Sequence, residues 1–229
     1  MMDDPCQLQS DDLRQLEHLR SLNELHIMLS RSGRYLHFDN DGMERLLLRH
    51  GRTLQHLTLG RFEQVDVEHI GCHCRHLSSL VLEGNRSYRW TEERQLPVLE
   101  SLTKVHITVR DQDPQDGDVQ PIDVPPWCLV ALMSSPRLQQ LKITACHTLD
   151  DAIFISSGAS PRLHSLELES CPNFTAASLW NVLDRSDYLS CLKVYRCSSI
   201  NDSNVIDIRT SVTVHNWDLQ LDYYRDEDT

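Results

Sequence analysis

The strongest constraint on the fold is a short cassette that recurs along the chain. Residues 135–146, SPRLQQLKITAC, and residues 160–171, SPRLHSLELESC, carry apolar side chains at the same three places and a cysteine at the same place. Counting from the first of these leucines, the apolar side chains take positions 1, 4 and 6 and the cysteine takes position 9. Such self-similarity is typical of a stacked array of repeats. Eight candidate cassettes have positions 1, 4 and 6 at Leu22-Leu25-Ile27, Leu54-Leu57-Leu59, Leu77-Leu80-Leu82, Leu102-Val105-Ile107, Leu138-Leu141-Ile143, Leu163-Leu166-Leu168, Leu189-Leu192-Val194 and Val214-Trp217-Leu219.

The spacing of the cassettes also favours an array. Their first residues are separated by 32, 23, 25, 36, 25, 26 and 25 residues, and most of these intervals fit the period of about 20 to 29 residues seen in arrays of short strand-containing repeats. The two long intervals indicate insertions at 31–43 and at 110–126, and the second reads as an acidic loop rich in Pro and Gly. We expect one domain over residues 1–229, an acidic tail at 222–229, and strands near 22–28, 54–60, 77–83, 102–108, 138–144, 163–169, 189–195 and 214–220.

Each cassette alternates apolar and polar side chains, which favours a half-buried strand. A turn and apolar side chains at helical spacing follow it. In TAASLWNVLDRS, for example, Thr175 can cap a helix whose inner stripe is Leu179, Val182 and Leu183. Strand, turn and helix at a constant period predict an α/β solenoid with a parallel sheet on the concave face and helices on the convex face. Because the helix row is the wider one, the array should curve into a horseshoe or arc.

The repeat accounts for four of the eight cysteines. Cys146, Cys171 and Cys197 all take position 9, where a small side chain can pack beneath the neighbouring backbone. Cys74 lies three residues before Leu77, at a place that serine takes in later units. We therefore expect buried thiols in a reducing compartment and no disulfides.

The pattern C/S-x-x-L-x-x-L-x-L-x-x-C-x-x-L, seen in residues 135–149, 160–174 and 186–200, resembles the cysteine-containing leucine-rich repeat. That repeat is typical of F-box and leucine-rich-repeat proteins, and the resemblance covers residues 19–221. It implies a leucine-rich-repeat solenoid shaped like ribonuclease inhibitor, which binds protein and is no enzyme. It further implies the substrate-recognition part of a cullin-RING ubiquitin ligase, in which an F-box would reach the cullin through a Skp-family adaptor.

An F-box is a helical module longer than the 21 residues that precede Leu22, so we expect none in this chain. The chain is then a repeat fragment of a longer ligase subunit, a form without the adaptor-binding part, or a relative outside the ligase system. One alternative function is a free-standing leucine-rich-repeat adaptor or assembly factor outside the ubiquitin system. A more remote alternative is a repeat-based GTPase activator, although the repeats of such activators look longer and differently patterned.

Composition narrows the partners and the compartment. The formal net charge is −12, which disfavours nucleic acid and anionic lipid because either needs a basic face, whereas a basic protein partner is permitted. The sequence has no apolar run of the roughly 18 residues that a membrane helix needs. The start, MMDDPCQLQSDD, lacks the features of a secretion signal and of a mitochondrial presequence. We expect a cytoplasmic or nuclear protein.

Chemical motifs are scarce. HIGCHCRH (69–76) has the residue types of a zinc site but no partner pair elsewhere, and Cys74 is already placed by the repeat. DQDPQDGD (111–118) resembles a calcium loop, yet aligning Gly117 with the loop glycine leaves Gln112 and Pro114 where carboxylates are needed. The sequence contains no phosphate-binding loop, nucleophile elbow or His-Glu-x-x-His pair. We expect no cofactor, no bound metal and no catalytic residues.

The concave face remains as the candidate site. Positions 3, 5 and 7 of each cassette should share the face that looks away from the helices. Lys142, Lys193, Tyr195 and Arg196 would form a mixed basic and aromatic patch of the kind that anchors interfaces. The alternative is a solvated sheet face without a partner. The C-terminal tail would cap the last repeat or fold back over this face. The predicted binding residues are His106, Lys142, Glu167, Glu169, Lys193, Tyr195, Arg196 and Asp218.

Overall fold

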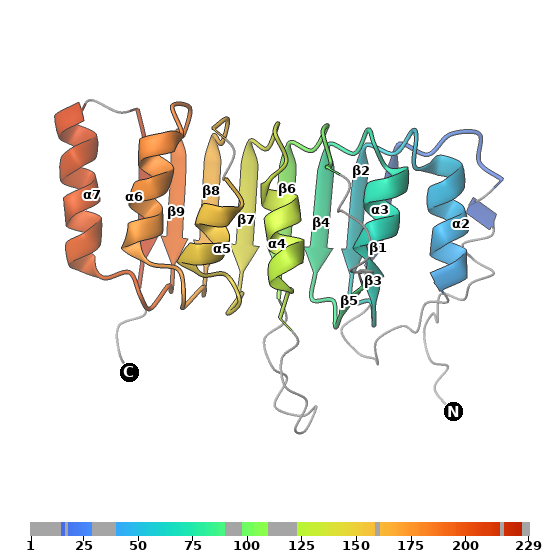
Figure 1. Cartoon of the computed structure of the whole chain (residues 1–229), viewed down its shortest axis with the longest axis horizontal. Helices are drawn as coiled ribbons and strands as arrows, with labels where there is room; N and C mark the ends of the chain where they lie inside the picture. Colours follow the sequence, from blue (N-terminus) through green and yellow to red (C-terminus); the bar gives the residue numbers. More distant parts are fainter. Residues whose placement is uncertain are drawn as a thin grey trace, which may run out of the picture.

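The computed structural model describes residues 15–16, 18–28, 40–89, 98–109, 123–158, 161–215 and 218–225. Over these residues the chain is an α/β protein with an eight-stranded parallel sheet whose strands lie in chain order (Figure 1). The strands are β1 (Glu24–Met28), β2 (His56–Gly60), β4 (Ser79–Glu83), β6 (Lys104–Thr108), β7 (Gln140–Thr144), β8 (Ser165–Glu169), β9 (Cys191–Tyr195) and β10 (Gln220–Tyr224). The helices are α2 (Asn40–His50), α3 (Val67–His73), α4 (Pro126–Met133), α5 (Asp151–Ser156), α6 (Ala176–Arg185) and α7 (Asp202–His215). A small second sheet pairs β3 (Val65–Asp66) with β5 (Tyr88–Arg89).

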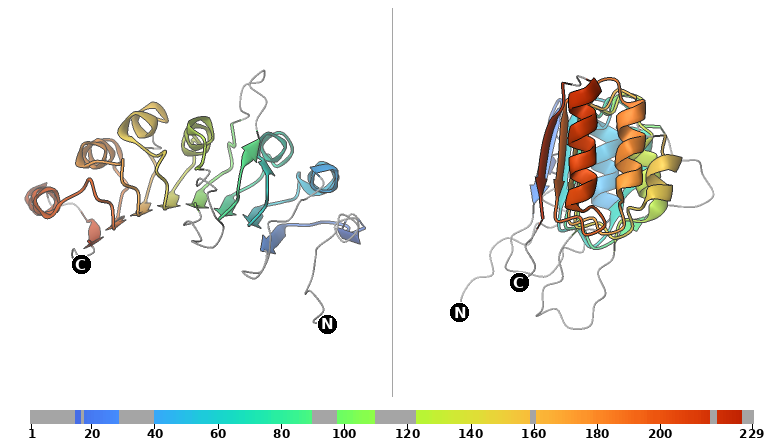
Figure 2. Two further views of the ribbon diagram at one scale, coloured as in Figure 1. Left: turned by 90° about the horizontal axis from the view of Figure 1, so that it is seen from below. Right: turned by 90° about the vertical axis from the view of Figure 1, so that its left-hand side faces the viewer.

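The labelled helices lie on one side of the sheet. Figure 2 shows them as an outer arc around an inner arc of strands. Neighbouring strands need about 4.8 Å of width, whereas packed helices need about 8–10 Å. The wider helix row therefore bends the stack, and the sheet becomes its concave side. We call the side of the eight-stranded sheet that faces away from α2 to α7 the bare face.

The leucines of the cassettes form the core between sheet and helices. In β8, Leu166 and Leu168 are buried, whereas the alternate side chains are partly exposed. Leu166 pairs in register with Leu141 of β7 and Leu192 of β9, so equivalent leucines stack strand upon strand. Each buried leucine contributes about 1.5–3 kcal/mol. The first seven strands begin two residues after the predicted starts and end at the predicted ends.

The residue after most strands has an unusual backbone conformation. Arg61, Ala145, Ser170 and Arg196 have φ values of 64°, 57°, 53° and 53°, in the left-handed region that side chains disfavour. The N–H of each donates to the last carbonyl of the next strand, as Ser170 N does to Tyr195 O at 2.8 Å. This bond, repeated along the sheet, turns the chain so that position 9 enters the core.

Side chains at position 9 join successive units inside the core. Three such side chains are at most 1% exposed: Cys146, Cys171 and Cys197. Cys171 Sγ donates to Ile143 O of the preceding unit at 3.6 Å. Asn85 takes the same position in the third unit, where its Nδ2 donates to Leu59 O at 3.0 Å and its Oδ1 accepts from Phe62 N at 2.9 Å. Asparagine and cysteine therefore fill the same structural role here.

The predicted helix start at Thr175 is confirmed. Its Oγ1 accepts a backbone N–H of the first turn of α6, whose buried stripe includes Leu179, Val182 and Leu183. The Thr175 hydroxyl also donates to Asp151 of α5 at 2.6 Å. The cap thus links two neighbouring helices as well as starting one.

The eighth unit lies further along the chain than predicted. Val214 belongs to α7, because this 14-residue helix buries Val205 and Ile208 and continues past the expected strand start. Register with β9 places Leu221 opposite Leu192 and Tyr223 opposite Val194. The last strand is therefore 220–224 in place of 214–220, and it takes in the start of the predicted acidic tail. Trp217 and residues 226–229 lie outside the described residues.

Both predicted insertions are described only in part. Residues 31–39 of the first and 110–122 of the second lie outside the described residues, as does the calcium-like stretch 111–118. The first insertion ends within α2, which begins at Asn40. The second ends at Pro126, which is the first residue of α4.

Candidate functional site

The bare face carries three rows of side chains at positions 3, 5 and 7. Parallel pairing in register aligns these positions across all eight strands. The middle row, at position 5, consists of His26, Thr58, Val81, His106, Lys142, Glu167, Lys193 and Asp222. Six of the eight predicted residues thus lie on one continuous surface, namely His106, Lys142, Glu167, Glu169, Lys193 and Tyr195.

Glu167 neutralises much of the predicted basic patch. Its Oε1 accepts a hydrogen bond from Lys142 Nζ, and its Oε2 lies 4.0 Å from Lys193 Nζ. All three side chains are partly exposed, so each pair contributes about 0–1 kcal/mol. The patch therefore presents a row of alternating charge, whereas the sequence suggested a mixed basic and aromatic patch.

His106 lies next to Lys142 in the middle row. Burial, helped by the nearby Lys142 charge, lowers the pKa of this imidazole below its ordinary 6.5. Its Nε2 lies 3.1 Å from Thr108 Oγ1, with which it shares a hydrogen bond. The N-terminal side of the alternating charges is therefore bounded by an uncharged ring at neutral pH.

The position-7 row adds an acidic and aromatic cluster. Glu169, Tyr195 and Tyr224 align on the adjacent strands β8, β9 and β10. Tyr224 is 54% exposed, whereas Tyr195 is partly buried. Among the described residues, no hydrogen bond or ion pair engages the Glu169 carboxylate. Two aromatic rings beside a carboxylate can accept a cationic or apolar side chain of another protein.

Two predicted residues lie elsewhere. Asp218 is exposed two residues ahead of β10, because that strand begins only at Gln220. Asp222 takes the expected place beside Lys193. Arg196 follows β9 in the left-handed conformation and lies at the edge of the bare face, not within a row. Asp222 and Tyr224 were missed, although the alternation of Leu219, Leu221 and Tyr223 could have indicated the correct register.

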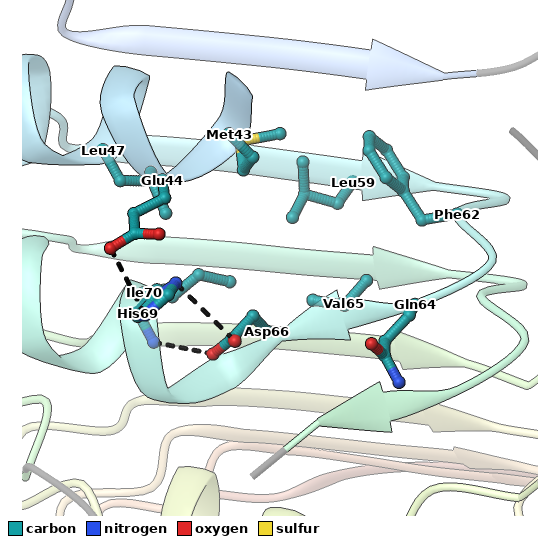
Figure 3. A pocket seen from close by; sticks show the side chains of 10 residues that line it. All are labelled: Met43, Glu44, Leu47, Leu59, Phe62, Gln64, Val65, Asp66, His69 and Ile70. Carbon is teal, nitrogen blue, oxygen red and sulfur yellow. Dashed lines mark hydrogen bonds and ion pairs between the residues drawn. The ribbon is translucent and has the colours of Figure 1, made fainter. Parts of the chain in front are cut away.

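A pocket lies apart from the bare face, between α2 and α3. It is small, with a cavity volume of about 20 Å³, and it opens to solvent. Figure 3 shows His69 joined by dashed lines to Glu44 and to Asp66. His69 Nε2 is 3.8 Å from Glu44 Oε1, and its Nδ1 is 3.6 Å from Asp66 Oδ2. The lining includes no Ser, Thr, Cys or Lys, so no hydroxyl, thiol or amine side chain lies beside this histidine in the pocket. Its apolar lining is Met43, Leu47, Leu59, Phe62, Val65 and Ile70.

The zinc-like stretch is divided between helix and core. His69 and His73 lie in α3, whereas Cys74 is fully buried in the core. Over the described part of the chain, no group of three His, Cys, Asp or Glu side chains is placed to hold a metal ion. None of the helices described there is both long and apolar enough to span a membrane.

No protein-family model matches the chain, and a comparison with curated proteins finds no match.

Proposed function

We propose that this chain is a non-catalytic protein-binding module with the architecture of a leucine-rich-repeat solenoid. The observation that carries the proposal is the bare face, whose in-register rows present charged and aromatic side chains. A regular array with one broad polar face is suited to binding another protein. The binding region is the C-terminal half of this face, centred on Glu169, Lys193, Tyr195 and Tyr224.

The more specific proposal rests on the sequence resemblance to F-box and leucine-rich-repeat proteins. On that basis the bound protein is a ubiquitination substrate, the compartment is the cytoplasm or the nucleus, and a Skp-family adaptor and a cullin belong to the same complex. A free-standing adaptor or assembly factor uses the same face without any ubiquitin transfer. Depleting the protein separates the two. The ligase version predicts that ubiquitination of the captured partner falls, and unchanged ubiquitination favours the adaptor.

The binding face is tested with a triple variant, Glu169→Ala/Tyr195→Ala/Tyr224→Ala. We expect capture of its partners from cell extract to fall by tenfold or more, since each lost aromatic anchor costs about 1–2 kcal/mol of binding. Quantitative mass spectrometry of captured proteins measures the loss, and the thermal melting temperature checks the fold.

The matched control places the same kinds of change on the helices. Ile155, Asp184 and Ile206 are exposed on α5, α6 and α7. The variant Ile155→Ala/Asp184→Ala/Ile206→Ala should retain the partners. Equal loss in both variants, or loss in the helix variant alone, would move the binding site away from the bare face.

A further inference from the structure

One edge of the sheet is rich in arginine, although the chain as a whole has a net charge of −12. All strands of the large sheet run in parallel, so their N-terminal ends lie along a single edge, which is the upper edge in Figure 1. The turns that lead into β1, β2 and β4 carry Arg20, Arg52 and Arg75 at this edge. Arg49, in the last turn of α2, lies a few residues ahead of the second of these turns. We call these four arginines the basic rim.

The repeat register spaces the rim arginines evenly. Arg20, Arg52 and Arg75 each lie four residues before the first paired residue of their strands, and those paired residues are aligned. Hydrogen bonds also join the turns, since Gln55 N donates to Asn23 O and Ser78 N donates to Gln55 O, both at 2.8 Å. Neighbouring turns are therefore about one strand spacing apart, close to 5 Å. The backbone therefore places these three arginines at equivalent points of three neighbouring turns.

Within the described residues, no partner neutralises this row. All four rim arginines are exposed, and no ion pair or side-chain hydrogen bond joins them to another part of the chain that the structure describes. The described turns 18–23, 49–55 and 72–78 contain no Asp or Glu at all. Arginines on neighbouring turns bring like charges near one another, and an anionic partner would relieve their mutual repulsion.

The rest of the edge has mixed charge. Glu100 precedes β6, Arg137 and Arg162 precede β7 and β8, and Asp187 precedes β9. A polyanion of uniform charge, such as a nucleic acid strand or an anionic membrane, would meet Glu100 and Asp187 unfavourably. A protein segment can place acidic side chains at the arginines and neutral or basic ones at the two carboxylates.

We infer that the basic rim binds an acidic segment of a partner protein, rich in Asp or Glu and laid along the turns before β1, β2 and β4. Guanidinium groups bind carboxylates through paired N–H donors, which suits a row of arginines. The net charge is −12, so a long polyanion would extend beyond the rim over acidic parts of the surface and be repelled there. A short acidic segment can contact the rim alone. The rim is separate from the bare face, so one chain can engage an acidic segment and a second surface together.

The test uses the full chain and a fluorescent peptide with a run of about four Asp and Glu residues flanked by Gly and Ser, so that the acidic run matches the three turns and does not extend over Glu100. Its affinity is followed by anisotropy at about 50 and 150 mM salt. We expect measurable binding that weakens as salt rises. The charge reversal Arg52→Glu/Arg75→Glu should weaken it by about tenfold or more, because two exposed ion pairs become repulsive.

The matched control is Arg209→Glu/Arg225→Glu, which changes net charge equally at two exposed arginines of α7 and the end of β10. It should retain the wild-type affinity to within about twofold. Equal weakening by both variants would show a general charge effect and overturn the inference, as would no peptide binding at the lower salt. An oligothymidine of equal charge, or phosphatidylserine vesicles, binding more tightly than the peptide with the same rim dependence would assign the rim to nucleic acid or membrane instead. Unchanged melting temperatures exclude unfolding as the cause.

Discussion

Replacing Phe154 by alanine should lower the free energy of unfolding by about 3–5 kcal/mol. Phe154 lies on α5, is fully buried, and meets Phe174 of the next unit edge to face at 5.2 Å between ring centroids. The substitution removes a large apolar side chain and leaves a cavity between two units that the backbone cannot close. Urea denaturation followed by circular dichroism measures the change.

The control for Phe154→Ala is its chain neighbour. Ile155 is 45% exposed on the same helix, so Ile155→Ala should cost well under about 1 kcal/mol. If both variants lowered the free energy of unfolding by similar amounts, the buried face of α5 would not be the one that carries Phe154.

Replacing Asn85 by alanine should destabilise the protein by about 2–4 kcal/mol. Asn85 is 3% exposed and satisfies two buried backbone groups, Leu59 O and Phe62 N. Alanine leaves both groups without a partner in a place that water cannot easily reach. Urea denaturation gives the magnitude, and hydrogen exchange should show faster opening of β2 and β4.

Asn85→Cys provides a graded comparison. A thiol at this position can still donate to Leu59 O, as Cys171 does to Ile143 O, but sulfur accepts poorly from the Phe62 N–H. We expect Asn85→Cys to lower the free energy of unfolding by about half as much as Asn85→Ala. A cysteine variant as unstable as the alanine variant would contradict the shared role of the two residues.

The sequence predicted the first seven strands well because each combines two core constraints. Positions 4 and 6 must be apolar to reach the core, and the left-handed turn that follows fixes where position 9 enters it. The last strand was predicted too early in the chain for two reasons. Tyr223 replaces the usual leucine, and Val212 and Val214 extend an apolar pattern that belongs to α7. Residues 214–219 therefore resembled a cassette, although β10 begins only at Gln220.

For the candidate site, the sequence could predict only which face of the sheet carries the residues, not how their side chains interact. Strand alternation placed His106, Lys142, Glu167 and Lys193 on one side, but it did not indicate that Glu167 engages both lysines. Such pairing depends on side-chain reach across strands, which a one-dimensional pattern leaves open. The basic rim was missed for another reason. Its arginines precede the cassettes, and only the parallel register brings together residues more than twenty positions apart.

Thiol labelling tests the central claim most directly, namely that the units stack in register and leave one sheet face open. Burial raises the pKa of Cys74 and Cys128 to about 12, and burial also raises the pKa of Cys146. The hydrogen bond with Cys197 and burial both raise the pKa of Cys171. Thiolates are the reactive form, so these thiols should resist alkylation. Cys191, by contrast, lies at position 3 of the bare face and is partly exposed.

The native protein is treated with N-ethylmaleimide, and each cysteine is followed by peptide mass spectrometry. Cys191 and the partly exposed Cys72 should react first, while Cys146, Cys171 and Cys197, each at most 1% exposed, stay unlabelled until denaturant is added. For Cys197 the protection comes from burial, because its hydrogen bond with Cys171 lowers the pKa of this thiol. Labelling of the three core cysteines at the rate of Cys191, or protection of Cys191 equal to that of Cys197, would contradict the stacked units and the open face.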